Sequence, residues 1–400
     1  MVYELNNLVK KYAYYAEVIG VKRIFRYLIL RIMRPLILKK NQMMQMYDEK
    51  SYARKIFIRK QKNNIPVGSL PYREKIDDFY KNFNLKINRY WHYCYSYTNG
   101  IYSENYIPEQ NFYQDIEPGL NRAEMVDGYD DKNQYDRLFD GVKMPVCALR
   151  CINGIYYDHN YNALNYTEEI LSTLDEHVEY IIKPSLKSKG GRDIFKIKRA
   201  GSSLYLDGKD VGIGSIMDVY RKDFVVQPFI EQHEKIKAIY PWSLNTVRVM
   251  SLRLSGKIII CCSFIRFGNS GLFTDNVASG GIAVGVLSNG TISDFAVDSS
   301  FRKYDKHPYT GRSFKGLEIP NINEIYKLAK TQHQRLHYFD LASWDVAIGV
   351  DGEPILIEVN LNEQDINYLQ LVNGPLFGEH THKVLEKVYL SKHQGFSSTN

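Results

Sequence analysis

One short segment constrains the fold more than any other. Residues 343–360 read SWDVAIGVDGEPILIEVN, two apolar runs separated by Asp351-Gly352. Asp-Gly between alternating apolar residues predicts a β-hairpin with a two-residue turn. In that register Asp345 lies directly opposite Glu358, and Asn360 lies two residues further along the same face. The other face is predicted to be continuously apolar and to consist of Trp344, Val346, Ile348, Ile355, Ile357 and Val359.

The polar face of this hairpin suggests a metal site. Two carboxylates placed directly opposite one another repel, unless a cation lies between them. Asp345, Glu358 and Asn360 would present three oxygen ligands. This set suits Mg²⁺, which binds one or two carboxylates together with substrate phosphates. The alternative is a solvated outer face with an incidental acidic pair, and a loop one residue longer would change the register.

Basic and glycine-rich segments upstream could hold phosphate. Lys183 ends the apolar run 180–184, and Lys189-Gly190-Gly191-Arg192 follows as a turn before the next β-rich run. Backbone amides of such a turn can cradle phosphate while nearby cations add charge, although an ordinary surface hairpin has the same composition. The pattern GxxxxGK[ST] is absent, so this is no P-loop.

A second predicted hairpin carries an arginine among apolar residues. Its turn is Ser255-Gly256, and Arg248 then shares a face with Met250, Leu252, Ile259 and Cys261. An arginine on an apolar face needs an anionic partner, either a protein carboxylate or a bound phosphate. Downstream, Asn276 precedes the run Ser279-Gly280-Gly281, a further glycine-rich element with polar side chains.

Taken in order, these segments resemble a known family. The order is DKNQYDRLF (131–139), IIKP (181–184), the KGG turn, VVQPFIEQHE (225–234), LNTVRV (244–249), DNVASGG (275–281), WDVAI (344–348) and IEVN (357–360). It resembles ATP-grasp enzymes, and more narrowly the sugar-transfer-associated ATP-grasp family found with bacterial surface polysaccharide genes. The resemblance covers roughly residues 90–390. It implies an α+β ATP-grasp fold, two α+β subdomains that grip ATP, preceded by a helical N-terminal region.

The resemblance also implies ATP and Mg²⁺ as cofactors and assigns residues to them. Lys132 and Lys183 would contact the nucleotide, and Asp345, Glu358 and Asn360 would hold Mg²⁺. Arg248 would act on the phosphate, and Lys189 and Arg192 of the basic turn are further catalytic candidates. The remaining nucleotide contacts would be Gly190, Gly191, Gln227, Phe229, Ile230, Asn276 and, at the ribose, either Glu231 or Glu234.

Enzymes of this class typically activate a carboxylate as an acyl phosphate, which an amine or hydroxyl then attacks. We therefore expect a carboxylate–amine or carboxylate–hydroxyl ligase that modifies a bacterial surface polysaccharide or its sugar precursor. Its partners would be a sugar or glycan acceptor and an amino acid. One alternative is an ATP-grasp kinase acting on a sugar or polyol hydroxyl, and another is a non-catalytic, membrane-associated assembly factor. Candidate acceptor contacts lie in the polar stretch 298–314, unless it is an ordinary loop: Arg302, Lys303, His307 and Arg312.

The charge of the chain is concentrated at its front. The net charge is +7, and residues 1–64 hold 15 Lys and Arg against four acids. Residues 21–34 predict an amphipathic helix that either packs on the body of the protein or lies on an anionic membrane surface. No nucleic-acid partner is expected, because neither a helix-turn-helix nor an RNP-like pattern is present. Five cysteines without CxxC spacing, and the absence of an 18-residue apolar stretch, favour a cytoplasmic protein, with or without peripheral attachment to the inner membrane face.

The chain divides into five expected parts. They are a basic segment over 1–70, a helical, aromatic-rich region over 71–175, a small ATP-grasp subdomain over 176–235, a C-terminal subdomain with the metal site over 236–392, and a tail over 393–400. Residues 72–140 predict helices with loops at Pro108 and Pro118-Gly119. β-rich runs fill 178–290, and further helices are expected over 321–335 and about 381–391.

Overall fold

The computed structural model describes residues 53–54, 70–186, 193–213, 216, 220 and 222–390. The chain divides into two compact units, residues 1–59 and 60–400, and every element described below belongs to the second. The predicted basic helix over 21–34 and the basic turn over 189–192 lie outside the described residues. In the part of the chain that is described, no helix combines the length and apolarity needed to cross a membrane.

Helices come first in the second unit, as predicted. They are α3 (Leu70–Lys81), α4 (Tyr90–Asn99), α5 (Glu109–Asn111), the π-helix Phe112–Ile116, α6 (Glu117–Leu120), α7 (Val126–Tyr129) and α8 (Tyr135–Leu138). The loop predicted at Pro118-Gly119 is wrong, because both residues lie in α6. Pro118 is in the first turn, where its missing N–H costs little. Gly119 packs on Val388, and a Cβ there would lie 3.0 Å from the Val388 Cγ1.

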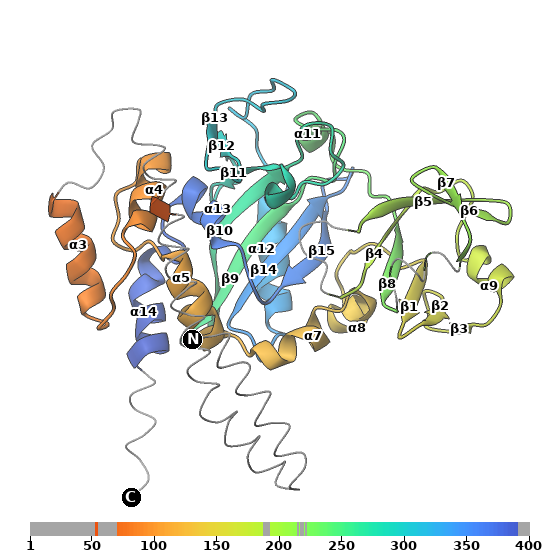
Figure 1. Ribbon diagram of the computed structural model, residues 1–400, viewed down its shortest axis with the longest axis horizontal. Helices are drawn as coiled ribbons and strands as arrows, with labels where there is room; N and C mark the ends of the chain where they lie inside the picture. The colour runs from red at the N-terminus through yellow and green to blue at the C-terminus, as the bar shows by residue number, and fades with distance from the viewer. Residues whose placement is uncertain are drawn as a thin grey trace, which may run out of the picture. The chain divides into compact units, whose positions relative to one another are not determined.

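The first sheet is antiparallel throughout, with the order β3-β2-β1-β8-β4-β5-β6-β7 (Figure 1). Its strands are β1 (Leu149–Ile152), β2 (Ile155–Tyr157), β3 (Ala163–Leu164), β4 (Tyr180–Pro184), β5 (Phe195–Ala200), β6 (Ser203–Leu206), β7 (Lys209–Val211) and β8 (Phe224–Pro228), and α9 (Thr167–Ser172) lies between β3 and β4. The sheet extends upstream of the boundary expected at residue 176, because β1 pairs directly with β8.

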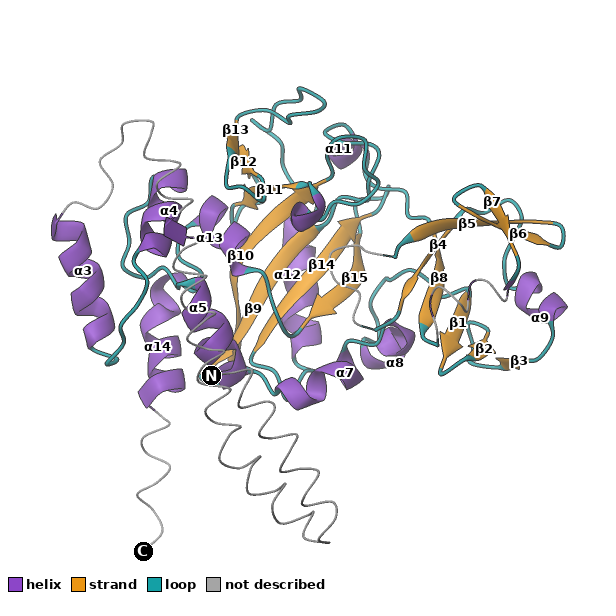
Figure 2. Ribbon diagram, in the orientation of Figure 1, coloured by secondary structure: helices purple, strands orange, loops and turns teal. Residues whose placement is uncertain are grey.

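The second sheet has the order β13-β12-β11-β10-β9-β14-β15 (Figure 2). Its strands are β9 (Val247–Leu254), β10 (Lys257–Phe267), β11 (Ile282–Val286), β12 (Ile292–Val297), β13 (Lys303–Tyr304), β14 (Leu341–Ile348) and β15 (Pro354–Asn360). The helices are α11 (Glu234–Lys237), α12 (Ile322–His333), α13 (Ile366–Asn373) and α14 (Thr381–Leu385), which continues as the π-helix Glu386–Leu390. The predicted helices over 321–335 and 381–391 are confirmed; α13 was not predicted.

Helices α12 and α13 cover opposite faces of the second sheet. Val284 of β11 packs in one apolar cluster with Ile325 of α12. The next residue, Gly285, points the other way, and a Cβ there would lie 2.7 Å from the backbone oxygen of Val372 in α13. Arg248 belongs to the α13 face, because its neighbour Val249 lies in the α12 cluster.

The β14–β15 hairpin has the predicted pairing at the metal site, although its turn and its strand pairing differ from the prediction. Asp345 pairs with Glu358, as expected. The turn is longer than two residues, since β14 ends at Ile348 and β15 begins at Pro354. A bulge on β15 shifts the pairing back by one residue. As a result the predicted apolar face is partly wrong: Leu356, rather than Ile355 and Ile357, joins the cluster around Trp344.

The β9–β10 hairpin has the predicted Ser255-Gly256 turn, because Leu254 pairs with Lys257. A bulge between Ile260 and Cys262 then shifts the register, so that Arg248 lies opposite Phe264. On its other side β9 pairs with β14, and there Arg248 lies opposite Asp345. Three strands thus converge at the position of the predicted metal site.

Candidate functional site

A cavity of about 140 Å³ lies between the two sheets and is lined by four of the predicted site residues, whereas Asn360, Arg248 and Lys132 are not in its lining. Lys183 of β4 lines it from the first sheet, and Asp345 and Glu358 line it from the second. Its other lining residues are Ile181, Ile194, Leu244, Thr246, Arg266, Phe273, Thr274, Asp275, Asn276 and Ile357. The side chain of Asn276 accepts a hydrogen bond from the backbone N–H of Ala278 at 2.8 Å, which fixes the local backbone conformation.

Asp345 is the centre of a buried ion-pair network. Its Oδ1 accepts from Arg248 Nε at 2.7 Å, and its Oδ2 accepts from Arg248 Nη2 at 2.7 Å and Arg266 Nη2 at 3.0 Å. Asn360 Nδ2 lies 3.4 Å from the same Oδ2. Burial alone would raise the pKa of Asp345, but the two arginines lower it to about 2. Of the two partners considered for Arg248, the structure therefore shows the protein carboxylate.

The second arginine, Arg266, was missed by the sequence analysis. It is 7% exposed, and its Nε lies 3.2 Å from Asp275 Oδ2. Thr246 completes this part of the network, since its Oγ1 donates to the same oxygen at 2.6 Å. Burial, the largest influence, raises the pKa of Asp275. The signal was available: Arg266 stands in the apolar run KIIICCSFIRF, and the argument made for Arg248 applies equally to it.

Two lysines lie on either side of Glu358: Lys183 lines this cavity, and Lys132 lines the neighbouring one. The Nζ of Lys132 lies 3.3 Å from Glu358 Oε2, and the backbone N–H of Lys132 donates to Ser185 O at 3.1 Å, next to the end of β4. Burial lowers the pKa of Lys132, but Glu358 and Asp130 raise it overall. The side chain of Lys183 has no hydrogen bond or ion pair with any other described residue. Burial and then repulsion by Lys132 lower the pKa of Lys183 to about 8.

This donor set fits a polyphosphate and Mg²⁺. A partly buried ammonium gains from an anion beside it, and the Lys183 side chain, with its lowered pKa and no ion pair among the described residues, has that property. For the metal, Glu358 Oε1 and Asn360 Oδ1 carry no hydrogen bond in the described structure, and Asp345 Oδ1 accepts only one. No three His, Cys, Asp or Glu side chains of the described ranges could hold a metal by themselves. Mg²⁺ would therefore bind through these three residues together with phosphate oxygens.

The segment proposed for the adenine leads from the first sheet to the second. The Gln227 side chain donates to Pro145 O and Cys147 Sγ, both at 3.3 Å. The backbone N–H of His233 donates to Ile348 O at 2.8 Å, which ties the segment to the end of β14. Between them Phe229 and Ile230 are half-buried, whereas Glu231 and Glu234 are both exposed and neither is favoured for the ribose.

A second cavity of about 130 Å³ adjoins this segment. It is lined by Lys132, Gln227, Cys147, Leu356 and Ile357, among others. Ile357 lines both cavities, so it is a site residue that the sequence analysis had assigned to the apolar core. The cause is the bulge on β15, which turns this side chain out of the cluster around Trp344.

The four predicted acceptor contacts do not converge on the cavity, although His307 and Arg312 are hydrogen-bonded through their backbones. The Arg302 side chain pairs with Asp298 at 2.7 Å and is 71% exposed, and Lys303 lies 4.0 Å from the ring centroid of Phe295. Arg312 is exposed, and none of the four lines either cavity. His307 is buried, with its Nε2 2.8 Å from Gly268 O. A role for these residues in acceptor binding stays a prediction.

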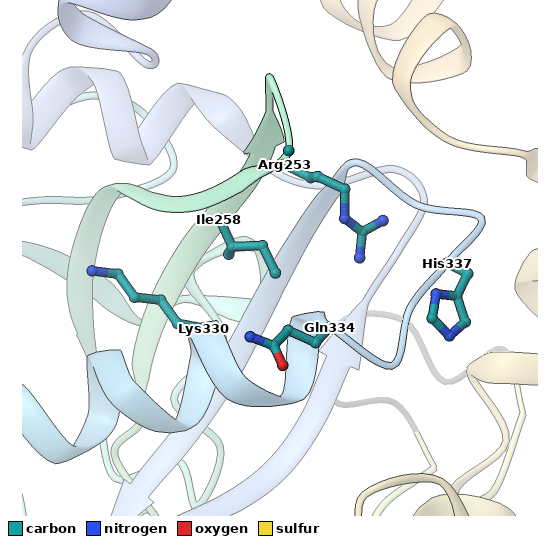
Figure 3. Close-up of a pocket in the computed structure, with 6 residues that line it drawn as sticks. Arg253, Ile258, Lys330, Gln334 and His337 are labelled. Atoms are coloured by element: carbon teal, nitrogen blue, oxygen red, sulfur yellow. The ribbon is translucent and has the colours of Figure 1, made fainter.

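A larger open groove, about 630 Å³, lies at the far end of β9, beside α12 (Figure 3). It is lined by Arg253, Gly256, Ile258, Lys330, Gln334 and His337. The guanidinium of Arg253 is already used, because it donates to His333 O at 2.7 Å and to Leu336 O and Phe339 O at 3.0 Å each. It thereby closes the C-terminal end of α12. This groove has no carboxylate in its lining and does not resemble the cavity between the sheets.

Comparison with known proteins identifies the same family that the order of the motifs suggested. A model of the family described as sugar-transfer associated ATP-grasp matches residues 111–386. The chain therefore belongs to the sugar-transfer associated ATP-grasp family, and its α+β fold is the ATP-grasp fold. A search among curated proteins found no match.

Matches among solved structures have low identity and low TM-scores. An L-amino acid ligase from Bacillus licheniformis is 13% identical with a TM-score of 0.33, and the match covers 62% of this chain and 47% of that one. The D-cycloserine synthetase DcsG is 12% identical with a TM-score of 0.38 (68% and 72% covered). The VanG D-Ala:D-Ser ligase from Enterococcus faecalis is 15% identical with a TM-score of 0.37 (64% and 60% covered). The chain spans about half the length of the L-amino acid ligase.

Proposed function

We propose that this protein is an ATP- and Mg²⁺-dependent ligase that joins a carboxylate to an amine or hydroxyl through an acyl phosphate. Its substrate would be a bacterial surface polysaccharide or its sugar precursor, in keeping with the family to which the chain belongs. One observation carries the proposal. The half-buried Lys183, whose side chain has no ion pair with a described residue, lines the same cavity as Glu358 and Asp345, which is an arrangement suited to a metal-bound polyphosphate.

In the first step a carboxylate oxygen of the acceptor attacks the γ-phosphorus of ATP, the bond from that phosphorus to the β,γ-bridging oxygen breaks, and ADP leaves. Lys132 and Lys183 would orient the phosphates by charge-assisted hydrogen bonds. Mg²⁺ held by Glu358, Asn360 and Asp345 would supply neutralisation of phosphate charge. In the second step the amine attacks the acyl carbon, inorganic phosphate leaves, and the amine proton passes to phosphate or solvent.

The state of the carboxylates in the cavity favours a ligase over a kinase. A kinase that acts on a hydroxyl uses a carboxylate to accept the hydroxyl proton. Here Asp345 is held by two arginines, Asp275 is bonded to Arg266 and Thr246, and Glu358 is paired with Lys132. The two aspartates are thereby occupied, and the free oxygen of Glu358 is the one assigned to the metal. A carboxylate acceptor is already deprotonated at neutral pH and needs no base.

Hydroxylamine trapping tests this proposal. The full chain would be incubated with ATP, Mg²⁺, hydroxylamine and a panel of hexuronates, and the products would be analysed for hydroxamate, ADP and sugar phosphate. The proposal expects a hydroxamate and ADP in equal amounts, with Lys183→Ala much slower. Stable phosphate on a sugar hydroxyl would indicate the kinase instead. ATP that neither binds nor turns over would refute both.

A further inference from the structure

Three large exposed side chains gather on the surface beside the cavity. Trp242 is 49% exposed, Leu272 is 40% exposed and Tyr309 is 54% exposed. The ring centroids of Trp242 and Tyr309 are 5.4 Å apart, and the buried ring of Tyr240 lies 5.1 Å from the first and 6.3 Å from the second. The Tyr240 hydroxyl donates to Leu272 O at 2.8 Å. We call Trp242, Leu272 and Tyr309 the aromatic platform.

Buried contacts beneath the platform hold it in position. Tyr240 stacks on His307 with a centroid distance of 5.2 Å and an angle of 18° between the rings. The Nδ1 of His307 accepts the backbone N–H groups of Tyr309 and Thr310, each at 3.2 Å, and its Nε2 faces Gly268 O. Both ring nitrogens are thus used in contacts that support the platform. A surface fixed in this way loses little conformational entropy when it binds.

The platform continues directly into the cavity. Two residues after Trp242 the chain reaches Leu244, which lines the cavity. Leu272 is followed by the lining residues Phe273, Thr274, Asp275 and Asn276. The platform and the lining of the cavity that holds Arg266 and Asp345 are therefore adjacent along the chain at two places.

The segment that carries Tyr309 is basic. Residues 298–315 contain five basic side chains, Arg302, Lys303, Lys306, Arg312 and Lys315, against Asp298 and Asp305. One pair cancels, because Arg302 is bonded to Asp298. The surroundings of the platform consequently favour an anionic ligand.

We infer that the aromatic platform binds a pyranose ring of an acidic saccharide and presents its carboxylate to the cavity. The C–H face of a pyranose ring packs on an aromatic side chain, while its hydroxyl groups stay in water or bond to polar tips such as the tyrosine hydroxyl. A patch of three side chains suits one sugar unit, whereas a stable protein interface needs about 20–30 residues on each side. The inference rests on the proposed function, since that function supplies the carboxylate to be activated.

Tryptophan fluorescence gives a direct test. The protein has three tryptophans, and Trp91 and Trp344 are fully buried, so Trp242 is the exposed reporter. The full chain would be titrated with a panel of hexuronate-containing disaccharides and with matched neutral disaccharides. An acidic disaccharide should shift the emission and protect Trp242 from acrylamide. Tyr309→Ala should weaken its binding about tenfold or more, which is 1.4 kcal/mol.

Two further measurements separate the outcomes. Saccharide binding to Trp242→Ala would be measured by saturation-transfer NMR, because this variant lacks the fluorescent reporter. The control is Tyr338→Ala, since Tyr338 is 40% exposed and lies outside both cavity linings. Saccharide binding without ATP turnover would keep the platform and refute the ligase. The inference would be refuted if no acidic disaccharide affects the fluorescence of Trp242. It would also be refuted if the platform instead mediates self-association or vesicle binding. Unchanged binding in both platform variants would likewise overturn it.

Discussion

Lys183 should make nucleotide binding weaken above about pH 8, whereas the neighbouring Lys132 should stay charged in that range. Burial and repulsion by Lys132 lower the pKa of Lys183 to about 8, while Lys132 is itself paired with Glu358 and has a raised pKa. Near neutral pH both lysines are charged when phosphate arrives. As the pH rises through about 8, Lys183 loses its proton and the free protein loses one of the two phosphate-binding charges.

The magnitude follows from this pKa. A hydrogen bond from an ammonium to phosphate contributes roughly 1.5–3 kcal/mol, so Lys183→Ala should weaken ATP binding by about 10- to 150-fold at pH 7. At pH 9.5 only about 3% of Lys183 is protonated in the free protein, and affinity falls in proportion to the competent fraction. Wild-type affinity should therefore fall roughly 30-fold, or by the whole Lys183 contribution if that is smaller.

Calorimetric titration with ATP at pH 7.0, 8.0 and 9.5 measures this effect. The sharpest variant is Lys183→Arg, because a guanidinium stays charged throughout that range. It should bind ATP with little pH dependence, whereas Lys183→Ala should bind weakly at every pH. Lys209→Ala, which changes an exposed lysine of β7, is the control. If Lys183→Ala binds like the wild type, or if the wild type shows no fall by pH 9.5, Lys183 does not contact phosphate.

Three further predictions concern other parts of the site. Glu358→Gln should remain folded and lose Mg²⁺-dependent turnover. Its ATP affinity without metal should change less than about tenfold, since the lost partner is the ion. A Mg²⁺ titration of activity checks this. Arg248→Ala should reduce turnover more than ATP affinity. It should also lower the free energy of unfolding by about 3 kcal/mol, because Asp345 stays buried with one arginine fewer. Urea titration measures this loss, and an unchanged free energy of unfolding would contradict the prediction. Glu117 accepts the N–H groups of Glu363 and Gln364 in the loop after Asn360, and burial raises its pKa to about 7. The unfolding free energy of the wild type relative to Glu117→Gln should accordingly fall by about 3 kcal/mol between pH 4.5 and pH 7, and a constant difference would contradict it.

Much of the fold could be predicted because local patterns specified it. The Ser255-Gly256 turn, the β-rich runs and the helix over 321–335 all appear in the structure. The pairing of Asp345 with Glu358 was also predicted, although the two-residue turn on which it rested is absent. The longer turn and the bulge on β15 shift the register in opposite directions, so the error in one is cancelled by the other.

What could not be predicted depends on contacts between distant segments. A bulge has no reliable signal in one strand, and the bulge on β15 moved Ile357 from the core into the site. The partner of Arg248 depends on β9 pairing with β14, about a hundred residues later in the chain. Seven of the eight residues of α13 are buried, including the polar Asn367 and Gln370, so the usual pattern of a buried apolar face and an exposed polar face gives no signal for it. The platform at Trp242 likewise joins three separate segments.

Transfer of ¹⁸O from substrate to phosphate tests the central claim most directly. The full chain would be incubated with ATP, Mg²⁺, hydroxylamine and hexuronates carrying ¹⁸O in both carboxylate oxygens, and the inorganic phosphate would be analysed by mass spectrometry. The account predicts one ¹⁸O atom in each phosphate released, because an acyl phosphate passes a carboxylate oxygen to phosphorus when the acyl carbon is attacked. Phosphate released without ¹⁸O, or phosphate that stays on a sugar hydroxyl, would contradict it.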